Sequence, residues 1–271
     1  MTIAAKDVMT LRQRTGLGMM ECKQALTEAN GDFEAAEAAV RAKLGADMLK
    51  RSGRSAEEGA LAVAKTDTAV ALIQLKSETD FTAKNENFLD IAKTLAERAL
   101  TLPDGEITPD DEMTRIIENL RITTKENISF ARGIKLTGEK IGSYVHHNQQ
   151  AAAIVAGRGD LSDELLTGIC QHLVAADGEF LPTPLAVDEA SLPADQLEQA
   201  RNAAVEEAKA SGKPPEIAEK IATGKTRKWV DDHTLLGQPY ARDTENKKPI
   251  RNHLPENAAL TAFVRYEVGD A

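Results

Sequence analysis

A pattern of two apolar strands followed by an amphipathic helix occurs twice in this chain and limits its fold more than any other feature. In the first copy, strands are predicted over 60–65 and 69–76, with a turn at 67–68. The helix that follows carries apolar residues three and four positions apart, which marks one buried face. That face consists of Phe88, Leu89, Ile91, Ala92, Leu95, Ala96 and Ala99.

The second copy repeats the order of these elements, although its residues differ. Its strands are predicted over 144–149 and 151–156, and a helix follows. The apolar face of that helix consists of Leu165, Leu166, Ile169, Cys170, Leu173 and Val174. Further strands are predicted over 128–137 and 262–268. We therefore expect an α+β fold, with a core of two related subdomains that each combine an antiparallel sheet with a helix.

Three short helices are predicted before the first strand, because apolar residues recur at helical spacing and glycines interrupt them. Asp32 is a suitable N-cap for the third helix. A unit of this size is too small for catalysis by itself and suits a grip on a peptide or protein. Its apolar positions are Val8, Leu11, Thr15, Met19, Cys22, Leu26, Ala29, Phe33, Ala36, Val40 and Leu44.

An insertion in the second half reads as a helical hairpin. A thin apolar stripe ends at Ser211 and Gly212, and Pro214 and Pro215 fit the start of another helix. The hairpin either packs on its own domain or forms a coiled-coil-like arm that meets a partner or a second copy. The predicted domains are a helical module (1–50), a linker (51–55), a first subdomain (56–140), a second subdomain (141–181 and 230–271) and the hairpin (182–229).

Composition and charge exclude several classes of protein. The net charge is −10 and the sequence pI is about 5.1, which argues against direct binding of nucleic acid. The N-terminus lacks the apolar segment of a signal peptide, and no apolar run is long enough to span a membrane. Cys22 and Cys170 are far apart and suit a reducing compartment. A cytoplasmic protein is therefore expected.

Motifs for covalent chemistry are missing from the sequence. Residues 222–226 end like a phosphate-binding loop, but Glu219 occupies the position of the required glycine. His146 and His147 are adjacent on a predicted strand, so their side chains are expected on opposite faces, which argues against a shared metal. We predict no catalytic residue, no metal ligand and no cofactor.

Residues 78–85 place a large aromatic side chain in a loop between a strand and a helix. In one interpretation, Thr79 caps the helix, Asp80 is a favourable charge at its N-terminus, and Phe81 is a hydrophobic staple against the helix face. In the other, Phe81 is an exposed wedge with the Asp80 charge at its base. The pattern alone favours the first interpretation, because Asp160 and Leu161 occupy a comparable place in the second copy.

Five segments in order resemble the elongation factor Ts family, the nucleotide-exchange factors for the translational GTPase elongation factor Tu. The resemblance covers almost the entire chain. The segments are LRQRTGLGMMECKQAL (11–26), ETDFTAKN (78–85), SGKPPEIAEKI (211–221), LLGQPY (235–240) and FVRYEVG (263–269).

The resemblance implies a ubiquitin-associated-like helical module, two related α+β subdomains and an inserted hairpin used in dimerisation. It implies that Phe81 enters an apolar pocket of the GTPase, while Asp80 and its neighbours Thr79 and Thr82 disturb the site that holds Mg²⁺. Further partner contacts are implied for Arg12, Met19, Met20 and His146. Two alternatives stay open: a scaffold or chaperone without exchange activity, and an enzyme with its site between the subdomains.

Overall fold

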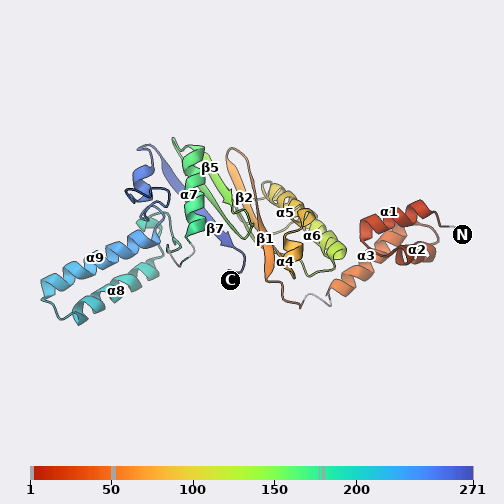
Figure 1. The fold of residues 1–271 in the computed structure, drawn as a ribbon, viewed down its shortest axis with the longest axis horizontal. Helices are drawn as coiled ribbons and strands as arrows, with labels where there is room; N and C mark the ends of the chain where they lie inside the picture. Colours follow the sequence, from red (N-terminus) through yellow and green to blue (C-terminus); the bar gives the residue numbers. More distant parts are fainter. Residues whose placement is uncertain (1–2, 50–52, 177, 179–180, 271) are drawn as a thin grey trace. The chain divides into compact units, whose positions relative to one another are not determined.

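The computed structural model describes residues 3–49, 53–176, 178 and 181–270, and its contacts divide them into two compact units. The first unit takes in the described residues up to Ala64, then Ala71–Lys135 and the described residues from Glu267. The second unit consists of Lys65–Val70 and the described residues of Leu136–Tyr266. Helices and antiparallel sheets occur in the same chain (Figure 1), which confirms the α+β prediction.

A three-helix module forms the N-terminal part of the first unit, as predicted. Its core is small and consists of Val8, Leu11, Cys22, Leu26 and Ala36. The first helix ends because Gly16 adopts a left-handed backbone with φ of 67°, and the Asp32 carboxylate accepts from the Ala35 amide at 3.0 Å to begin the third. The predicted linker lies partly outside the described residues, at 51 and 52. The helices are α1 (Ala5–Thr15), α2 (Met19–Glu28) and α3 (Phe33–Leu49).

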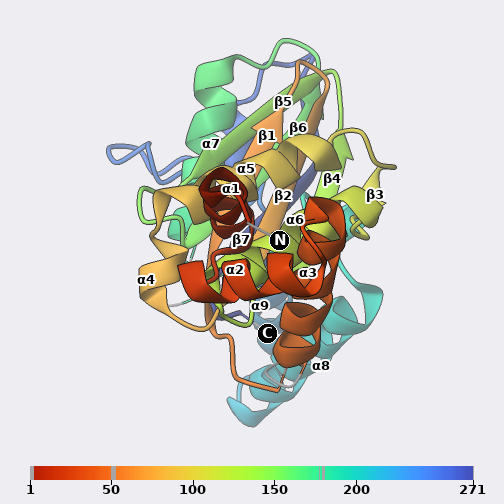
Figure 2. The ribbon, with the colours of Figure 1, turned by 90° about the vertical axis from the view of Figure 1, so that its right-hand side faces the viewer.

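The first sheet has the strand order β1-β2-β4-β3, and β3 pairs antiparallel with β4. Figure 2 shows α5 and α6 in front of its strands. Ile73 and Leu75 of β2 pack with Phe88 and Leu95 of α5, which buries the apolar face that the sequence predicts. The strands are β1 (Glu58–Lys65), β2 (Ala69–Ser77), β3 (Gly105–Glu106) and β4 (Ser129–Thr137), and the helices are α4 (Asp80–Ala83), α5 (Glu86–Ala99) and α6 (Asp111–Thr124).

Helix α6 is an element that the sequence analysis missed. Asp110 caps it by accepting from the Met113 amide at 2.8 Å, and Met113, Ile117 and Leu120 bury one face against the core. Its C-cap, Lys125, has a left-handed backbone with φ of 59°, so the chain turns sharply there. Because of this turn, residues 126 and 127 leave the helix towards the loop that follows β2.

The second sheet has the order β5-β6-β7, with β5 and β6 antiparallel from Lys140 opposite Gly157 to Val145 opposite Ala152. Helix α7 packs on β5 and β6 (Figure 1). Ser162 caps it by accepting from the Leu165 amide at 3.2 Å. The elements are β5 (Lys140–Val145), β6 (Ala151–Arg158), α7 (Asp163–Ala175) and β7 (Ala259–Glu267).

The predicted strand over 144–149 is wrong in its position. Strand β5 ends at Val145, and the chain then turns so that the His146 amide donates to the carbonyl of Ala151 at 2.8 Å. Gln149 has a φ of 58°, which is incompatible with a strand. Residues 146–150 therefore form the turn between β5 and β6.

The inserted segment forms a helical hairpin, as predicted. Its narrow seam buries Ala204, Ala208 and Ala222, and residues 222–226 lie inside the second helix. None of the described helices is both long and apolar enough to cross a bilayer. The helices are α8 (Ala194–Ala210) and α9 (Pro215–His233), and the 3-10 helices η1 (Glu189–Ser191) and η2 (Ile250–His253) flank the hairpin in the sequence.

Candidate functional site

The loop after β2 contains a helix of a single turn, α4, that is separate from α5. Thr79 is its N-cap: the side-chain hydroxyl accepts from the Thr82 amide at 3.3 Å, and the carbonyl accepts from the Ala83 amide at 3.2 Å. Asn85 interrupts the helical path with a ψ of 133° and caps α5 in turn. The capping role predicted for Thr79 is confirmed. We call residues 78–82 the Phe81 loop.

Phe81 projects from α4 into solvent, with 84% of its surface exposed. The hydrophobic staple is therefore wrong, because a staple would bury the ring against a helix face. The neighbouring Ala83 is buried instead and supplies the apolar contact of the turn. The structure therefore matches the second interpretation in one respect, since the aromatic ring is exposed on a short capped helix.

Asp80, next to Phe81, is half-exposed and forms an ion pair with Lys84 at 2.7 Å, one helical turn further on. The hydrogen bond from Lys84 holds the pKa of the Asp80 carboxyl below its usual value. Asp80 is therefore ionised at neutral pH and carries its own counter-ion. Solvent screens the pair, which contributes little to stability.

Glu126 fixes the Phe81 loop from a distant part of the chain, and sequence reasoning missed it. The hydroxyls of Thr79 and Thr82 both donate to Glu126 Oε1, each at 2.7 Å. The backbone amide of Thr79 donates to Glu126 Oε2 at 3.3 Å. One carboxylate therefore accepts from the cap residue twice and from the residue after Phe81.

Glu78, at the start of the loop, is held by Asn127, the residue that follows Glu126. The Asn127 amide donates to Glu78 Oε1 at 2.7 Å, and Arg54 pairs with Glu78 Oε2 at 3.3 Å. The side-chain amide of Asn127 also donates to the carbonyl of Arg54 at 2.9 Å. Both ends of the loop are thus attached to the two residues that follow the left-handed turn of α6.

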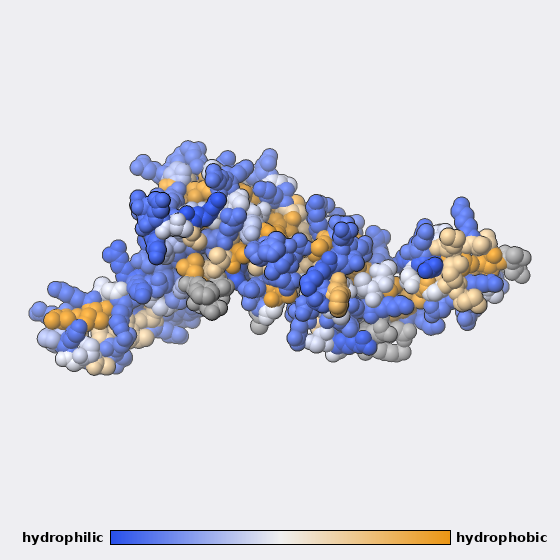
Figure 3. Space-filling model, viewed as in Figure 1, coloured by the Kyte–Doolittle hydropathy of each residue, from blue (hydrophilic) through white to orange (hydrophobic). Residues whose placement is uncertain are grey.

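Other candidate residues lie in the helical module. Arg12 is exposed on α1, and Met19 and Met20 are 43% and 76% exposed on α2. Met9 of α1, which was not predicted, is also exposed. Figure 3 shows hydrophobic surface on this part of the chain. These residues lie on α1 and α2, whereas Phe81 lies on α4.

His146 lies in the second unit, just beyond β5. It is half-buried, and its Nδ1 is 3.2 Å from the hydroxyl oxygen of Tyr144. Its ring centre is 4.3 Å from that of His147, so the expectation of opposite faces is wrong, because both residues lie in a turn. Over the described residues, the His, Cys, Asp and Glu side chains form no group of three that could hold a metal ion.

These features define an α+β protein with an exposed aromatic side chain on an anchored loop. The family model described as "Elongation factor TS" matches residues 78–270, beginning at the Phe81 loop. The chain is 37% identical to "Elongation factor Ts" of Thioalkalivibrio sulfidiphilus, over 100% of this chain and 93% of that protein. It is 35% identical to "Elongation factor Ts" of Legionella pneumophila strain Lens, over 99% and 93% of the two chains. The chain belongs to the elongation factor Ts family, which confirms the resemblance.

Proposed function

We propose that this chain is a guanine-nucleotide exchange factor in translation elongation. It binds the GDP form of elongation factor Tu, disturbs the Mg²⁺ and nucleotide site of that GTPase, and promotes GDP release so that GTP can bind. The 84% exposure of Phe81 on an anchored loop carries the proposal, together with membership of the family. The chain makes and breaks no covalent bond in this role and needs no cofactor. It acts in the cytoplasm.

The Phe81 loop supplies the two kinds of contact that exchange requires. Phe81 enters an apolar pocket of the GTPase, since a buried aromatic is an effective anchor in a protein interface. Asp80 brings a negative charge close to the groups that position Mg²⁺, which demands a strict octahedral arrangement of oxygen ligands. Thr79 and Thr82 hold both side chains in one turn. Nucleotide binding weakens because the metal is no longer held correctly.

Contacts outside the loop extend the interface. Arg12, Met19 and Met20 contact the GTPase domain from the helical module, where the exposed Met side chains can adapt to the partner surface. His146 contacts another domain of the partner from the second unit. Contacts by both units make the interface large enough for a specific complex.

Exchange of this kind is a coupling between two binding equilibria. If the factor loosens nucleotide by a given ratio, nucleotide must loosen the factor by the same ratio. Fresh nucleotide therefore displaces the factor, which returns to the next GTPase molecule. An amount of the chain far below that of the GTPase is therefore enough to exchange the nucleotide on all GTPase molecules.

Release of labelled GDP from elongation factor Tu, with this chain at catalytic amounts, tests the proposal. We expect the parent to accelerate GDP release. Phe81→Ala and Asp80→Ala should each lower that accelerated rate by roughly tenfold or more, as truncation of a central interface anchor does. Asp90→Ala, at an exposed position of α5, and Leu185→Ala, at an exposed apolar position, are the matched controls. A parent that does not accelerate GDP release would contradict the exchange function and favour the scaffold or chaperone interpretation. Phe81→Ala and Asp80→Ala variants that are as active as the parent would show that the loop is not part of the binding site.

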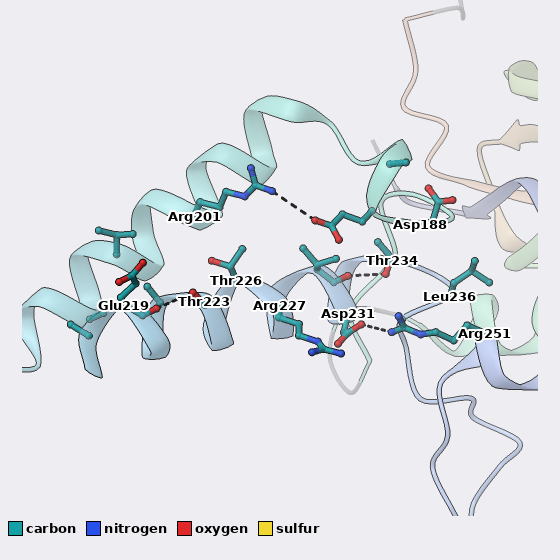
Figure 4. Close-up of a pocket in the computed structure, with 18 of the residues that line it drawn as sticks. Asp188, Arg201, Glu219, Thr223, Thr226, Arg227, Asp231, Thr234, Leu236 and Arg251 are labelled. Carbon is teal, nitrogen blue, oxygen red and sulfur yellow. Dashed lines mark hydrogen bonds and ion pairs between the residues drawn. The ribbon is translucent and has the colours of Figure 1, made fainter. Parts of the chain in front are cut away.

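We also propose that the hairpin at 182–229 joins two copies of the chain. A groove of about 1130 Å³ runs along α8 and α9 (Figure 4). Its floor includes Ala208, Ala218, Ala222 and Val230, and Val205 is 39% exposed at its side. A hairpin with so narrow a seam buries little apolar area alone, and a second hairpin would cover the rest.

Ion pairs rim this groove and leave its floor apolar. Arg201 reaches Glu189 at 3.7 Å, and Arg251 pairs with Asp231 (Figure 4). Sedimentation across a concentration series should show a dimer that Val205→Glu dissociates, because a charge there faces the seam of the second copy. Met9→Glu, at an exposed apolar position outside the hairpin segment, is the control. A parent that stays monomeric at all concentrations contradicts the dimer.

A further inference from the structure

We propose that Glu126 is a positioning residue for nucleotide exchange, which holds the Phe81 loop in its binding shape before the partner arrives. This inference rests on the exchange function proposed above. Glu126 does not itself contact the partner in this role. It acts through Thr79 and Thr82, the residues on either side of Asp80 and Phe81.

The loop needs such a support, because its own contacts are weak. A helix of one turn costs more conformational entropy to nucleate than its few hydrogen bonds return. The cap bond from the Thr82 amide to Thr79 is long, at 3.3 Å, and the Asp80–Lys84 pair is exposed. Hydrogen bonds to a carboxylate are about twice as strong as neutral ones, so the three bonds to Glu126 attach the turn around Phe81 firmly.

The chemistry of the acceptor fixes the direction of every bond. An ionised carboxylate can only accept, so both threonine hydroxyls must donate to Glu126. A hydroxyl has one proton, and Thr79 therefore presents its lone pairs to the Thr82 amide. The bond to Glu126 thus orients the hydroxyl that caps α4. Removing the carboxylate loosens both the attachment of the loop and the cap itself.

The position of Glu126 is fixed in turn by the end of α6. The left-handed Lys125 turns the chain, and the amide of Glu126 donates to the Thr124 hydroxyl at 3.3 Å. The next residue, Asn127, holds Glu78 through its own amide. Glu126 is therefore part of a rigid base, and the Phe81 loop takes its shape from that base.

A pre-organised loop has a specific kinetic signature. If the competent shape is only partly populated, the apparent dissociation constant rises in inverse proportion to that population. The maximal rate of release at saturating factor then changes little, since every bound molecule has the competent shape. A variant that is partly unfolded also raises the half-saturating concentration of total chain, so the folded fraction must be measured separately by denaturant unfolding.

Titration of GDP release against the concentration of folded factor, with the folded fraction taken from denaturant unfolding, separates these cases. We expect Glu126→Ala to raise the half-saturating concentration about tenfold at an unchanged maximal rate, from the loss of charge-assisted hydrogen bonds. Glu126→Gln should lie between parent and Glu126→Ala, because its amide oxygen still accepts from the threonines while its NH₂ faces the Thr79 amide. Glu118→Ala, at an exposed position of α6, is the matched control and should equal the parent.

A double-variant cycle shows whether Glu126 acts through the threonines. In the Thr79→Ala, Thr82→Ala background, Glu126→Ala should raise the half-saturating concentration little further, because both hydroxyl donors are gone and only the 3.3 Å bond from the backbone amide of residue 79 remains. If Glu126→Ala costs the same tenfold in that background, Glu126 acts independently of the loop hydroxyls and the proposal is overturned.

Hydrogen exchange of the amides of Thr82, Ala83 and Lys84 in the free chain gives a readout without the partner. We expect faster exchange in Glu126→Ala than in Glu118→Ala, since local opening is easier when the loop is not attached. An inactive parent overturns the exchange function itself. An active parent, with Glu126→Ala unchanged in both half-saturation and amide protection, overturns the role of Glu126 alone.

Discussion

The imidazole Nε2 of His172 lies 2.9 Å from the side-chain oxygen of Gln238, and both side chains are fully buried in the second unit. The other ring nitrogen, Nδ1, accepts from the Ala241 amide at 3.2 Å. Gln238 uses its NH₂ group to donate to the carbonyls of Pro182 and Asp232, so its oxygen is the acceptor. These contacts fit a neutral His172 that carries its proton on Nε2.

The first prediction is a loss of stability on mild acidification. Burial lowers the pKa of His172 below the ordinary value of 6.5, so the unfolded chain takes up a proton that the native chain resists. The contribution to stability is complete above about pH 6.5 and is lost as pH falls towards the lower native pKa, with a slope of at most about 1.4 kcal/mol per pH unit. Urea unfolding between pH 5 and 7.5 measures it.

Two histidine variants provide the comparison. His172→Gln should flatten this part of the pH dependence, because the titrating group is removed. His147→Gln, at an exposed position, should keep the slope of the parent. Equal slopes in the parent and His172→Gln contradict the prediction.

The second prediction contrasts two phenylalanines of one segment. Phe88 is 1% exposed in the core of the first unit, whereas Phe81 is 84% exposed. Phe88→Ala should cost about 3–5 kcal/mol of unfolding free energy, the usual range for an aromatic core truncation. Phe81→Ala should stay within about 0.5 kcal/mol of the parent, as surface changes do. A large loss for Phe81→Ala in denaturant unfolding would restore the staple interpretation.

The third prediction concerns Gly159, whose φ is 79° and whose missing Cβ would overlap the carbonyl oxygen of Asn257. Gly159→Ala should destabilise the second unit by several kcal/mol, since left-handed strain of about 1–2 kcal/mol adds to overpacking. Gly212 has a similar φ of 68° but open space around it. Gly212→Ala should therefore show the strain alone. Equal losses of melting temperature in both variants contradict the overlap.

The fourth prediction is slow reaction of Cys170 in the native protein. Burial raises the pKa of its thiol to about 12, and only the thiolate is reactive. In a Cys22→Ser background, a thiol reagent at pH 8 should modify Cys170 only after denaturant is added. Fast modification of the native chain would show that α7 opens readily.

The helices of the module and of the hairpin could be predicted, because their apolar faces and their capping residues are formed by neighbouring positions in the sequence. The stripe of α6 was equally local: Asp110 precedes Met113, Ile117 and Leu120 at helical spacing, so this helix could have been found. The end of β5 could not, because the turn after Val145 depends on pairing with β6 and on the left-handed Gln149.

The structure confirms Thr79 as a helix cap and adds Glu126 as the support of its loop. Thr79 is recognisable as a cap from its own neighbours. Glu126 lies 47 residues away from Thr79 and 44 from Thr82, so only the folded chain brings them together. The exposure of Phe81 likewise depends on how α5 packs against the core of the first unit. Local pattern alone favoured a staple, whereas Ala83 and Phe88 already fill the apolar contacts of that segment.

The exposed ring of Phe81 can contribute binding free energy when it is buried against another molecule. Moving a phenylalanine from water into an apolar pocket is worth about 1.5–3 kcal/mol, and about 1.4 kcal/mol corresponds to a factor of ten in a binding constant. One side chain therefore holds roughly a tenfold to hundredfold gain that is realised only on a complementary surface. If Phe81 anchors the GTPase as proposed, the incoming nucleotide must supply the same free energy to expel that ring, and the exposure of Phe81 then sets part of the work required in each exchange cycle.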